Sequence, residues 1–204
     1  MANTDIQCVL FDFGGVIAEE GFRKALRETA RRDGLDPDEL PRLAMEAVYD
    51  SGFVLGRGSE ADFWQELQSH APVNESFEDF RDRVLAGFVV RPAMLRLADA
   101  LRTSGITTAI LSDQTHWLDT LDRRDGVFRH FDRVFNSFYL GKGKRDASLF
   151  DDVLAELRCP APAALFIDDS QGHVQRAHQR GLRAILFEET ADCIRQVRRM
   201  TGLD

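Results

Sequence analysis

The feature that most constrains the fold is an alternation of short apolar runs and amphipathic helical patterns after Arg91. Apolar runs bounded by turn residues are typical of buried strands, and such alternation predicts a parallel sheet joined by right-handed helical crossovers. Together with an isolated run near the N-terminus, the expected strands are residues 8–11, 106–112, 132–137, 163–167 and 183–187. We expect helices over 92–104, from about 115, over 149–157, around 174–180 and over 190–200.

Two of the apolar runs end in acidic residues. Asp12 follows the first run, and Asp168 and Asp169 follow the run at 163–167. Parallel strands bring their carboxyl ends to one edge of the sheet, which is where open α/β folds bind their ligands. Three carboxylates at one edge repel each other strongly unless a cation lies between them. The pattern therefore predicts a divalent metal ion and a phosphorylated or otherwise anionic ligand.

A helical segment separates the first strand from the others. Between Glu19 and Val90 the sequence has helical apolar spacing and no convincing strand. Gly34 ends the first helical pattern, and Asp36 with Pro37 predicts the start of the second. Ser59 with Asp62 and Ser76 with Asp79 have the spacing of helix N-terminal caps. We expect a small helical bundle over residues 19–90, inserted into a core of 1–18 and 91–204.

Composition excludes several classes of partner. The chain has 204 residues and a formal net charge of −8, which argues against general binding to nucleic acid or to an anionic membrane. We see neither a secretion signal nor a long apolar span, and we expect a cytoplasmic protein. The oligomeric state is left open between a monomer and a homodimer. Cys8, Cys159 and Cys193 lack metal-ligand spacing and are predicted to be small buried side chains in a reducing compartment.

Polar residues follow several of the predicted strands. Ser112 ends the strand at 106–112, and Lys144 lies in a loop after the strand at 132–137. Taken alone, Asp12 could cap a turn, Ser112 could cap a helix, and Lys144 could be a solvated loop residue. The adjacent pair Asp168 and Asp169 is a poor structural choice after a buried strand, and we interpret it as functional.

The order of these motifs resembles the haloacid dehalogenase-like hydrolase superfamily from end to end. The matching segments are FDFGGVI at 11–17, AILSD at 109–113, GKGKRDASLF at 141–150 and FIDDSQGHVQRA at 166–177. The resemblance implies an α/β fold with a Rossmann-like three-layer core, and it identifies the inserted bundle as a helical cap of the subfamily IA, C1 type. Each motif is short, but together they occur in the family's order.

The resemblance also implies a role for each matched residue. Asp12 would be the nucleophile, forming an aspartyl-phosphate that water then hydrolyses. Mg²⁺ would be held by Asp12, the Gly14 carbonyl and Asp169, with Asp168 holding a metal-bound water or pairing with Lys144. The resemblance places Gly15, Ser112, Asp113 and Lys144 around the substrate, where Ser112 would bind phosphoryl oxygens and Lys144 would offset their charge.

The sequence departs from the family's pattern at Gly14. Most phosphatases of the superfamily have an Asp there, which protonates the leaving oxygen and later activates water. Such a group typically contributes about 10²–10⁴ in rate. A bacterial branch that includes α-D-glucose-1-phosphatase also has Gly at this position, and a sugar 1-phosphate has a comparatively acidic leaving oxygen. We therefore favour a small phosphorylated metabolite such as a sugar phosphate, with Glu19 or Glu20 as another source of the proton.

Two other functions are compatible with Gly14. A 2-haloacid dehalogenase also uses an Asp nucleophile and needs no acid, but it is metal-free and has little use for Asp168 and Asp169. A degenerate site that only binds or senses a phosphorylated ligand is the third possibility, and Arg145, which replaces the usual Pro after Lys144, agrees with divergence. A response-regulator receiver is set aside because its acidic pair belongs on the first strand.

Four side chains outside these roles have more than one interpretation. Phe63 and Trp64 are interpreted as cap core rather than as a substrate platform, and His173 as structural rather than as part of the site. Arg57 lies between Gly56 and Gly58 in a connection between two cap helices. An ordinary helix connection is favoured there over a mobile loop with Arg57 facing the site.

Overall fold

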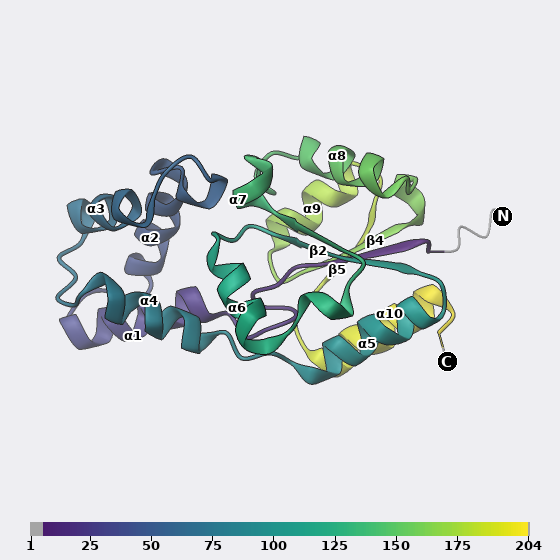
Figure 1. Ribbon diagram of the computed structural model, residues 1–204, viewed down its shortest axis with the longest axis horizontal. Coiled ribbons are helices and arrows are strands. Elements are labelled where there is room, and N and C mark those ends of the chain that lie inside the picture. The colour runs from purple at the N-terminus through teal and green to yellow at the C-terminus, as the bar shows by residue number, and fades with distance from the viewer. Residues whose placement is uncertain (1–5, 204) are drawn as a thin grey trace.

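A computed structural model describes residues 6–203, which form a parallel sheet covered by helices on both faces, with a helical segment beyond one end of the sheet (Figure 1). The strands are β1 (Cys8–Phe11), β2 (Thr107–Ser112), β3 (Arg133–Asn136), β4 (Ala164–Asp168) and β5 (Arg183–Leu186). They pair in the order β3-β2-β1-β4-β5, and every pair is parallel. The predicted α/β fold class and its five strands are confirmed.

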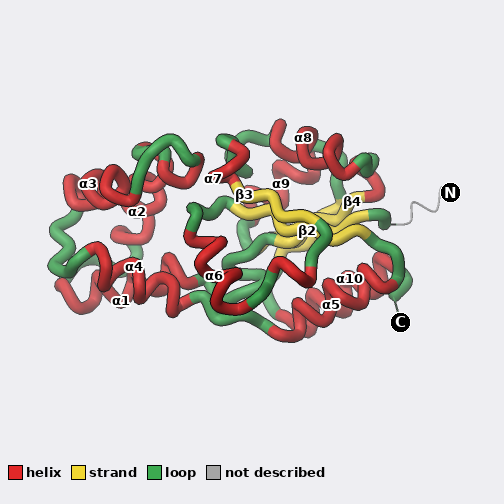
Figure 2. The backbone as a smooth tube through the Cα atoms, in the orientation of Figure 1, coloured by secondary structure: helices red, strands yellow, loops and turns green. Residues whose placement is uncertain are grey.

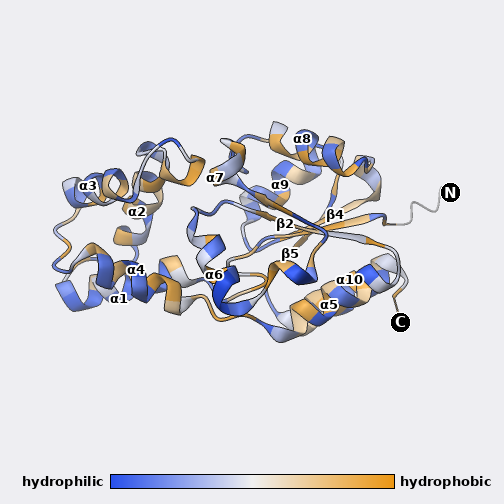
Figure 3. Ribbon diagram, in the orientation of Figure 1, coloured by the Kyte–Doolittle hydropathy of each residue, from blue (hydrophilic) through white to orange (hydrophobic). Residues whose placement is uncertain are grey.

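The sheet has two buried faces because side chains alternate along each strand. In β1, Cys8 and Leu10 face one hydrophobic cluster, whereas Val9 and Phe11 face the other. Helices α8 (Ser148–Leu157) and α9 (Gln171–Gln179) cover the first face, and α5 (Pro92–Thr103), α6 (Trp117–Asp125) and α10 (Thr190–Thr201) cover the second. Figure 2 shows the strands enclosed between these helical layers, and Figure 3 shows apolar strands among amphipathic helices. The fold is therefore a three-layer α/β core.

Four helices lie between β1 and α5. They are α1 (Gly21–Asp33), α2 (Glu39–Asp50), α3 (Glu60–His70) and α4 (Phe77–Gly87), with a short 3-10 helix η1 (Phe53–Leu55) after α2. We call this helical segment, residues 19–90, the cap. The chain enters and leaves it through two adjacent crossings. There Glu19 N donates to Val89 O at 2.8 Å and Arg91 N donates to Ile17 O at 2.8 Å. The cap lies beyond the carboxyl ends of the strands (Figure 1).

Most predicted helix signals in the cap are confirmed, with one correction. Gly34 ends α1 in the left-handed conformation, and Ser59 with Asp62 forms a reciprocal capping box. The second helix begins at Glu39 rather than after Asp36, so its predicted start is wrong. Asp36 Oδ1 instead accepts from the backbone N–H groups of Asp38 and Glu39, which forms a turn ahead of the helix.

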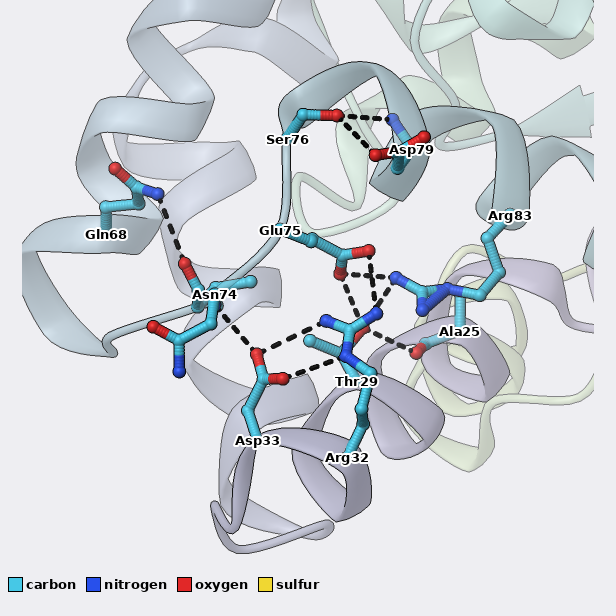
Figure 4. A network of polar contacts seen from close by, with 11 residues as sticks. Ala25, Thr29, Arg32, Asp33, Gln68, Asn74, Glu75, Ser76, Asp79 and Arg83 are labelled. Atoms are coloured by element: carbon cyan, nitrogen blue, oxygen red, sulfur yellow. Dashed lines mark hydrogen bonds and ion pairs between the residues drawn. The ribbon is translucent and has the colours of Figure 1, made fainter.

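A polar network fixes the connection between α3 and α4 (Figure 4). Glu75, in this connection, accepts from the Thr29 hydroxyl at 2.9 Å, from Arg32 Nη1 at 3.1 Å and from Arg83 Nη2. Asp33 accepts from Arg32 Nε at 2.8 Å and from the Asn74 backbone N–H at 2.8 Å. The network joins α1, α4 and the loop before α4 at this corner of the cap.

The cysteines and the aromatic residues behave largely as predicted. Cys8, Cys159 and Cys193 are buried and free, although Cys8 Sγ lies only 2.8 Å from Cys159 Sγ. Phe63 is buried in the cap core, and Trp64 packs against Phe77 and Phe80. Among residues 6–203, no helix combines the length and the apolar character needed to cross a membrane.

Candidate active site

Asp12 lies at the centre of the carboxyl edge of the sheet, immediately after β1. Its Oδ1 accepts from the Ser112 hydroxyl at 2.8 Å and from the Phe13 backbone N–H at 2.7 Å. Ser112 is the last residue of the neighbouring strand β2, so the parallel register itself brings the two side chains together. Ser112 caps no helix, because α6 begins five residues later at Trp117. The structural alternative for Ser112 is therefore excluded.

Lys144 joins the two acidic strand ends. Its Nζ lies 2.9 Å from Asp12 Oδ2 and 2.6 Å from Asp168 Oδ2. The side chain is 1% exposed, so Lys144 is not a solvated loop residue. Asp168 also accepts from the Ser170 backbone N–H at 2.7 Å and lies 3.2 Å from His173 Nδ1. Asp168 thus holds Lys144 in place, and His173 contacts the site rather than lying apart from it.

Three carboxylates form a cluster that suits a hard cation. Asp12, Asp168 and Asp169 each offer an oxygen, and these oxygens all lie within 4.8 Å of one another. Mg²⁺ prefers oxygen ligands in octahedral geometry and usually retains several waters. The donor set therefore fits the predicted metal, with Asp12 and Asp169 offering oxygens to it and both Asp12 and Asp168 in contact with Lys144.

The surroundings shift the pKa values of Asp12 and Asp168, the two carboxyls at strand ends, in opposite directions. Burial raises the pKa of Asp12 to about 8, against the opposing effect of the Lys144 ammonium. Burial also disfavours charge on Asp168, but Lys144 and His173 outweigh it and hold the pKa of Asp168 below its usual range. The Lys144 ammonium is thus paired most closely with Asp168. Full ionisation of Asp12 calls for the additional positive charge that a bound cation supplies.

The two glycines after Asp12 differ in conformation. Gly15 has a φ of +87°, and a Cβ there would lie 2.3 Å from Asp169 Oδ2, so only glycine fits beside that carboxylate. Gly14 lies outside the left-handed region, and a Cβ there would face the Phe88 ring at 3.1 Å and Gln114 Nε2 at 3.6 Å. The side of Gly14 that an acidic side chain would occupy is therefore bordered by Phe88 and Gln114.

Asp113 is placed differently from Ser112. Its two oxygens accept from the Lys144 backbone N–H at 2.9 and 3.0 Å, and the Tyr49 hydroxyl donates to its Oδ2. Arg145 lies over the Tyr49 ring, 3.5 Å from the centroid. Asp113 therefore positions the Lys144 loop and contacts the cap, and both of its oxygens are already hydrogen-bonded.

A pocket of about 290 Å³ lies between the cap and the core and contains these residues. The sequence interpretation missed several of its residues, because their proximity depends on how the cap packs. The residues on the cap side are Glu20, Phe22, Arg23, Met45, Val48, Tyr49 and Val54. Those on the core side include Asp12, Gly14, Ser112, Asp113, Gln114, Thr115, Lys144, Arg145, Asp169, His173 and Arg176.

The two glutamates considered as proton sources lie in different surroundings. Glu19 is exposed and pairs with Arg91 at 3.6 Å. Glu20 lines the pocket and accepts from the Arg23 backbone N–H at 2.7 Å as the N-cap of α1. Burial raises the pKa of Glu20, and the charge of Asp169 adds to this effect. Only Glu20 of this pair is therefore placed near the acidic cluster.

Arg57 does not line the pocket. Its Nη2 donates to Gly141 O at 2.9 Å, which ties the loop after η1 to the core. Nearby, the Ser137 hydroxyl donates to Val54 O at 2.8 Å. The favoured interpretation of this loop as an ordinary connection agrees with its contacts, and Arg57 serves cap–core packing.

Comparison with known proteins decides the family. The family model for haloacid dehalogenase-like hydrolases matches residues 6–181, which include all four motifs. The chain belongs to the haloacid dehalogenase-like hydrolases. Among curated relatives of this hydrolase, bifunctional epoxide hydrolase 2 of Mus musculus is 28% identical over 97% of the chain, but the chain spans only 39% of that protein. The GMP/IMP nucleotidase YrfG of Escherichia coli is 25% identical, covering 89% of this chain and 82% of the nucleotidase.

Solved structures support the same fold for this hydrolase. A Bacteroides thetaiotaomicron enzyme of the family, in complex with magnesium and inorganic phosphate, has a TM-score of 0.69 at 17% identity, covering 90% of this chain and 94% of that one. L-2-haloacid dehalogenase from Xanthobacter autotrophicus, with chloropropionic acid covalently bound, has a TM-score of 0.64 at 15% identity, covering 88% and 76%. At these identities the likeness establishes the fold and leaves the reaction open.

Proposed function

We propose that this hydrolase is a Mg²⁺-dependent phosphatase that releases phosphate from a small phosphorylated metabolite through an aspartyl-phosphate on Asp12. The observation that carries the proposal is the set of contacts around Asp12. Its carboxylate lies against the Ser112 hydroxyl at 2.8 Å and the Lys144 ammonium at 2.9 Å, with Asp169 beside it. A nucleophile, a charge-offsetting cation and a carboxylate cluster are the parts that phosphoryl transfer requires.

Each of these residues has a distinct part in the reaction. Asp12 attacks phosphorus, and the bond between phosphorus and the leaving oxygen breaks as the acyl phosphate forms. Ser112 and the Phe13 backbone N–H orient the Asp12 carboxylate, and Lys144 reduces the repulsion between that carboxylate and an anionic phosphate. Bound Mg²⁺, held by Asp12, Asp169 and the Gly14 carbonyl, would supply Lewis-acid stabilisation of the phosphoryl oxygens.

Gly14 supports a substrate whose leaving oxygen needs little protonation. Residue 14 has no acidic side chain, and the space beside it is bordered by Phe88 and Gln114. A sugar 1-phosphate fits this requirement because its leaving hemiacetal oxygen is more acidic than an ordinary alcohol. The likeness to the Escherichia coli nucleotidase makes nucleoside monophosphates a useful second class in any substrate panel.

A dehalogenase, an activity found on the same fold, is the second candidate, and it is favoured by the absence of an acid at residue 14. Halide departure needs no proton. The buried pairing of Lys144 with Asp168, and the presence of Asp169 within the acidic cluster, favour the metal-dependent reaction instead. A site that binds a phosphorylated ligand without turnover is distinguished by the same experiment.

The test uses purified enzyme with an aryl phosphate, sugar phosphates, nucleoside monophosphates and a 2-chloroacid. Each is supplied with Mg²⁺ and with a chelator, to wild type and to Asp12→Asn. We expect phosphate release that requires Mg²⁺ and falls by a factor of about 10³ or more in Asp12→Asn, because the covalent route is lost. Halide release that is indifferent to the chelator would overturn the proposal, and so would metal binding without any turnover.

A further inference from the structure

The pocket wall beside Gly14 contains an amide rather than an acid. Gly14 is not in the left-handed region, and a Cβ there would lie 3.1 Å from the Phe88 ring, so the space beside it is narrow. The polar atom nearest to that space is Gln114 Nε2, 3.6 Å from the position that a Cβ would take. Phe88, buried at 1% exposure and packed against Phe13, borders the remaining side.

Gln114 is fixed through its backbone while its side chain is available. Its carbonyl oxygen accepts from the Ser137 hydroxyl at 3.3 Å. In the part of the chain that the structure describes, no hydrogen bond to its side-chain amide is found, although the residue lines the pocket with Asp12. An amide carries both donors and an acceptor, so it can hold a water in a fixed orientation at any pH.

Several of the other polar side chains near Asp12 are already engaged. Ser112 and Lys144 contact Asp12 itself, Asp113 accepts from the Lys144 backbone and from Tyr49, and His173 contacts Asp168. Glu20 accepts from the Arg23 backbone N–H as a helix cap. Gln114 is thus a neutral hydrogen-bonding group in the same pocket as Asp12, and its side chain has no hydrogen-bond partner among the described residues.

We propose that Gln114 is a positioning residue that orients the water which hydrolyses the phosphorylated form of Asp12. This inference rests on the proposed phosphatase function. In the step, the water oxygen bonds to phosphorus while the bond between phosphorus and Asp12 breaks, and Asp12 departs as a carboxylate. One proton of the water passes to a phosphoryl oxygen, so the product is dihydrogen phosphate and no additional base is consumed.

This assignment separates the two halves of the reaction. Formation of the acyl phosphate from a good leaving group needs no help from Gln114, whereas hydrolysis needs a water held in line with phosphorus. Misplacing a reacting group by about 1 Å can cost about 100-fold in rate. Loss of the amide should therefore slow the second step selectively and cause phosphorylated enzyme to accumulate.

The test is rapid-quench and steady-state kinetics of Gln114→Met with p-nitrophenyl phosphate and Mg²⁺. Methionine keeps the length and volume of glutamine but cannot orient water. We expect a near wild-type burst of nitrophenol followed by turnover slowed about 10–100-fold, with acid-stable phosphate trapped on the protein. Gln175→Met, the same change at an exposed position of α9, should behave like wild type. Gln114→Ala, checked for folding by its thermal melt, should repeat the burst.

Four results would overturn the inference. One is full turnover by Gln114→Met, and another is an equal fall in its burst and steady-state rates, which would indicate a general structural role. A burst in Glu20→Gln with none in Gln114→Met would assign the water to Glu20 instead. Absence of phosphate release by the wild type itself would overturn the proposed function first and this inference with it, so the two failures are distinguishable.

Discussion

The carboxylates of the acidic cluster around Asp12 differ in their contacts. Asp168 is committed to Lys144 through a 2.6 Å contact, while Asp169 lies against the backbone of Gly15. The position of Asp169 therefore depends on a residue that has no side chain. Any group added to Gly15 must either move that carboxylate or move the loop that carries Asp12.

Gly15→Ala is expected to weaken Mg²⁺ binding and to reduce stability. The new Cβ would lie 2.3 Å from Asp169 Oδ2, at a φ of +87°. The positive φ alone costs about 1–2 kcal/mol for a residue with a Cβ. The contact with Asp169 adds displacement of a metal ligand, which calorimetric Mg²⁺ titration would detect together with a thermal melt.

Gly34→Ala is the matched control for Gly15→Ala. Gly34 also has a positive φ, of +71°, but nothing lies within 4 Å of the position that its Cβ would take. It should lose stability through backbone strain alone and keep wild-type Mg²⁺ affinity. Equal Mg²⁺ affinity in Gly15→Ala and Gly34→Ala would contradict the placement of Asp169 at the metal, as would unchanged affinity in Asp169→Asn.

The sequence predicted which site residues lie together where their position along a strand was enough to place them. Asp12, Ser112 and Asp168 all follow or end buried strands, and parallel pairing brings such ends together whatever the rest of the fold does. The contacts of Asp113 and Gln114 could not be predicted in this way. They depend on Tyr49 and on how Phe88 borders Gly14, and both are fixed by how the cap packs on the core.

At the level of elements, the connection between α3 and α4 combines the buried apolar side chains of Ala71 and Val73 with a network of charges. The Glu75 side chain is 5% exposed and lies between Arg32 and Arg83, which are 45% and 25% exposed. A buried carboxylate with two guanidinium partners is stabilising only while all three charges are present. The network is consequently the part of the cap most sensitive to loss of one group.

Glu75→Gln is expected to lower the free energy of unfolding by about 1–3 kcal/mol at pH 7, since it leaves a partly buried Arg83 without a counter-charge. Loss of the Glu75–Arg32 ion pair contributes less of this decrease in unfolding free energy, because water screens the half-exposed Arg32. Urea denaturation measures the difference. Glu39→Gln, which removes an exposed partner of Arg42, is the control and should have little effect.

We also expect the loss of stability in Glu75→Gln to depend on pH. Burial disfavours charge on Glu75, but hydrogen bonds from Arg32 and Arg83 outweigh it and lower its pKa, and Arg32 likewise lowers the pKa of Asp33. A lowered folded pKa contributes stability that is present above the ordinary value of about 4.3 and is lost as the pH falls through the folded pKa. The stability gap between wild type and Glu75→Gln should therefore shrink below about pH 4. A gap that stays constant from neutral to acidic pH would contradict the ion-pair network.

Element boundaries illustrate what local sequence can specify. The Ser59 capping box and the Gly34 terminator act through neighbouring backbone groups, and both were predictable. The start of α2 was not, because Asp36 satisfies the N–H groups of Asp38 and Glu39 in a turn instead of opening the helix. The short helix α7 (Ser137–Leu140) also escaped prediction, since it is held by packing against η1 across the cap–core boundary.

Over the whole molecule, cap and core meet through two kinds of contact. Beside the loop after η1, Arg57 and Ser137 donate hydrogen bonds to backbone carbonyls across the boundary. At the site, Tyr49 of α2 donates to Asp113, and Asp113 in turn holds the Lys144 backbone. The second contact links the position of the cap directly to the loop that carries Lys144.

Tyr49→Phe is expected to loosen cap docking without unfolding either part. The ring and its contact with Arg145 remain, while Asp113 loses a hydrogen bond worth about 1.5–3 kcal/mol for a charged acceptor. The docked state should become less populated, and KM should rise about 10-fold or more when substrate must restore docking. Faster amide hydrogen exchange is expected in the second half of α2 and at the Lys144 amide.

The second tyrosine of the chain provides the control for Tyr49→Phe. Tyr139 is 62% exposed, and its hydroxyl donates to Asp119 on the core, outside the pocket. Tyr139→Phe removes a hydroxyl–carboxylate contact of the same type without touching the Lys144 loop, so KM and exchange at Lys144 should stay at wild-type values. Equal effects of the two substitutions would show that cap position and the Lys144 loop are uncoupled, because only Tyr49 connects them through Asp113.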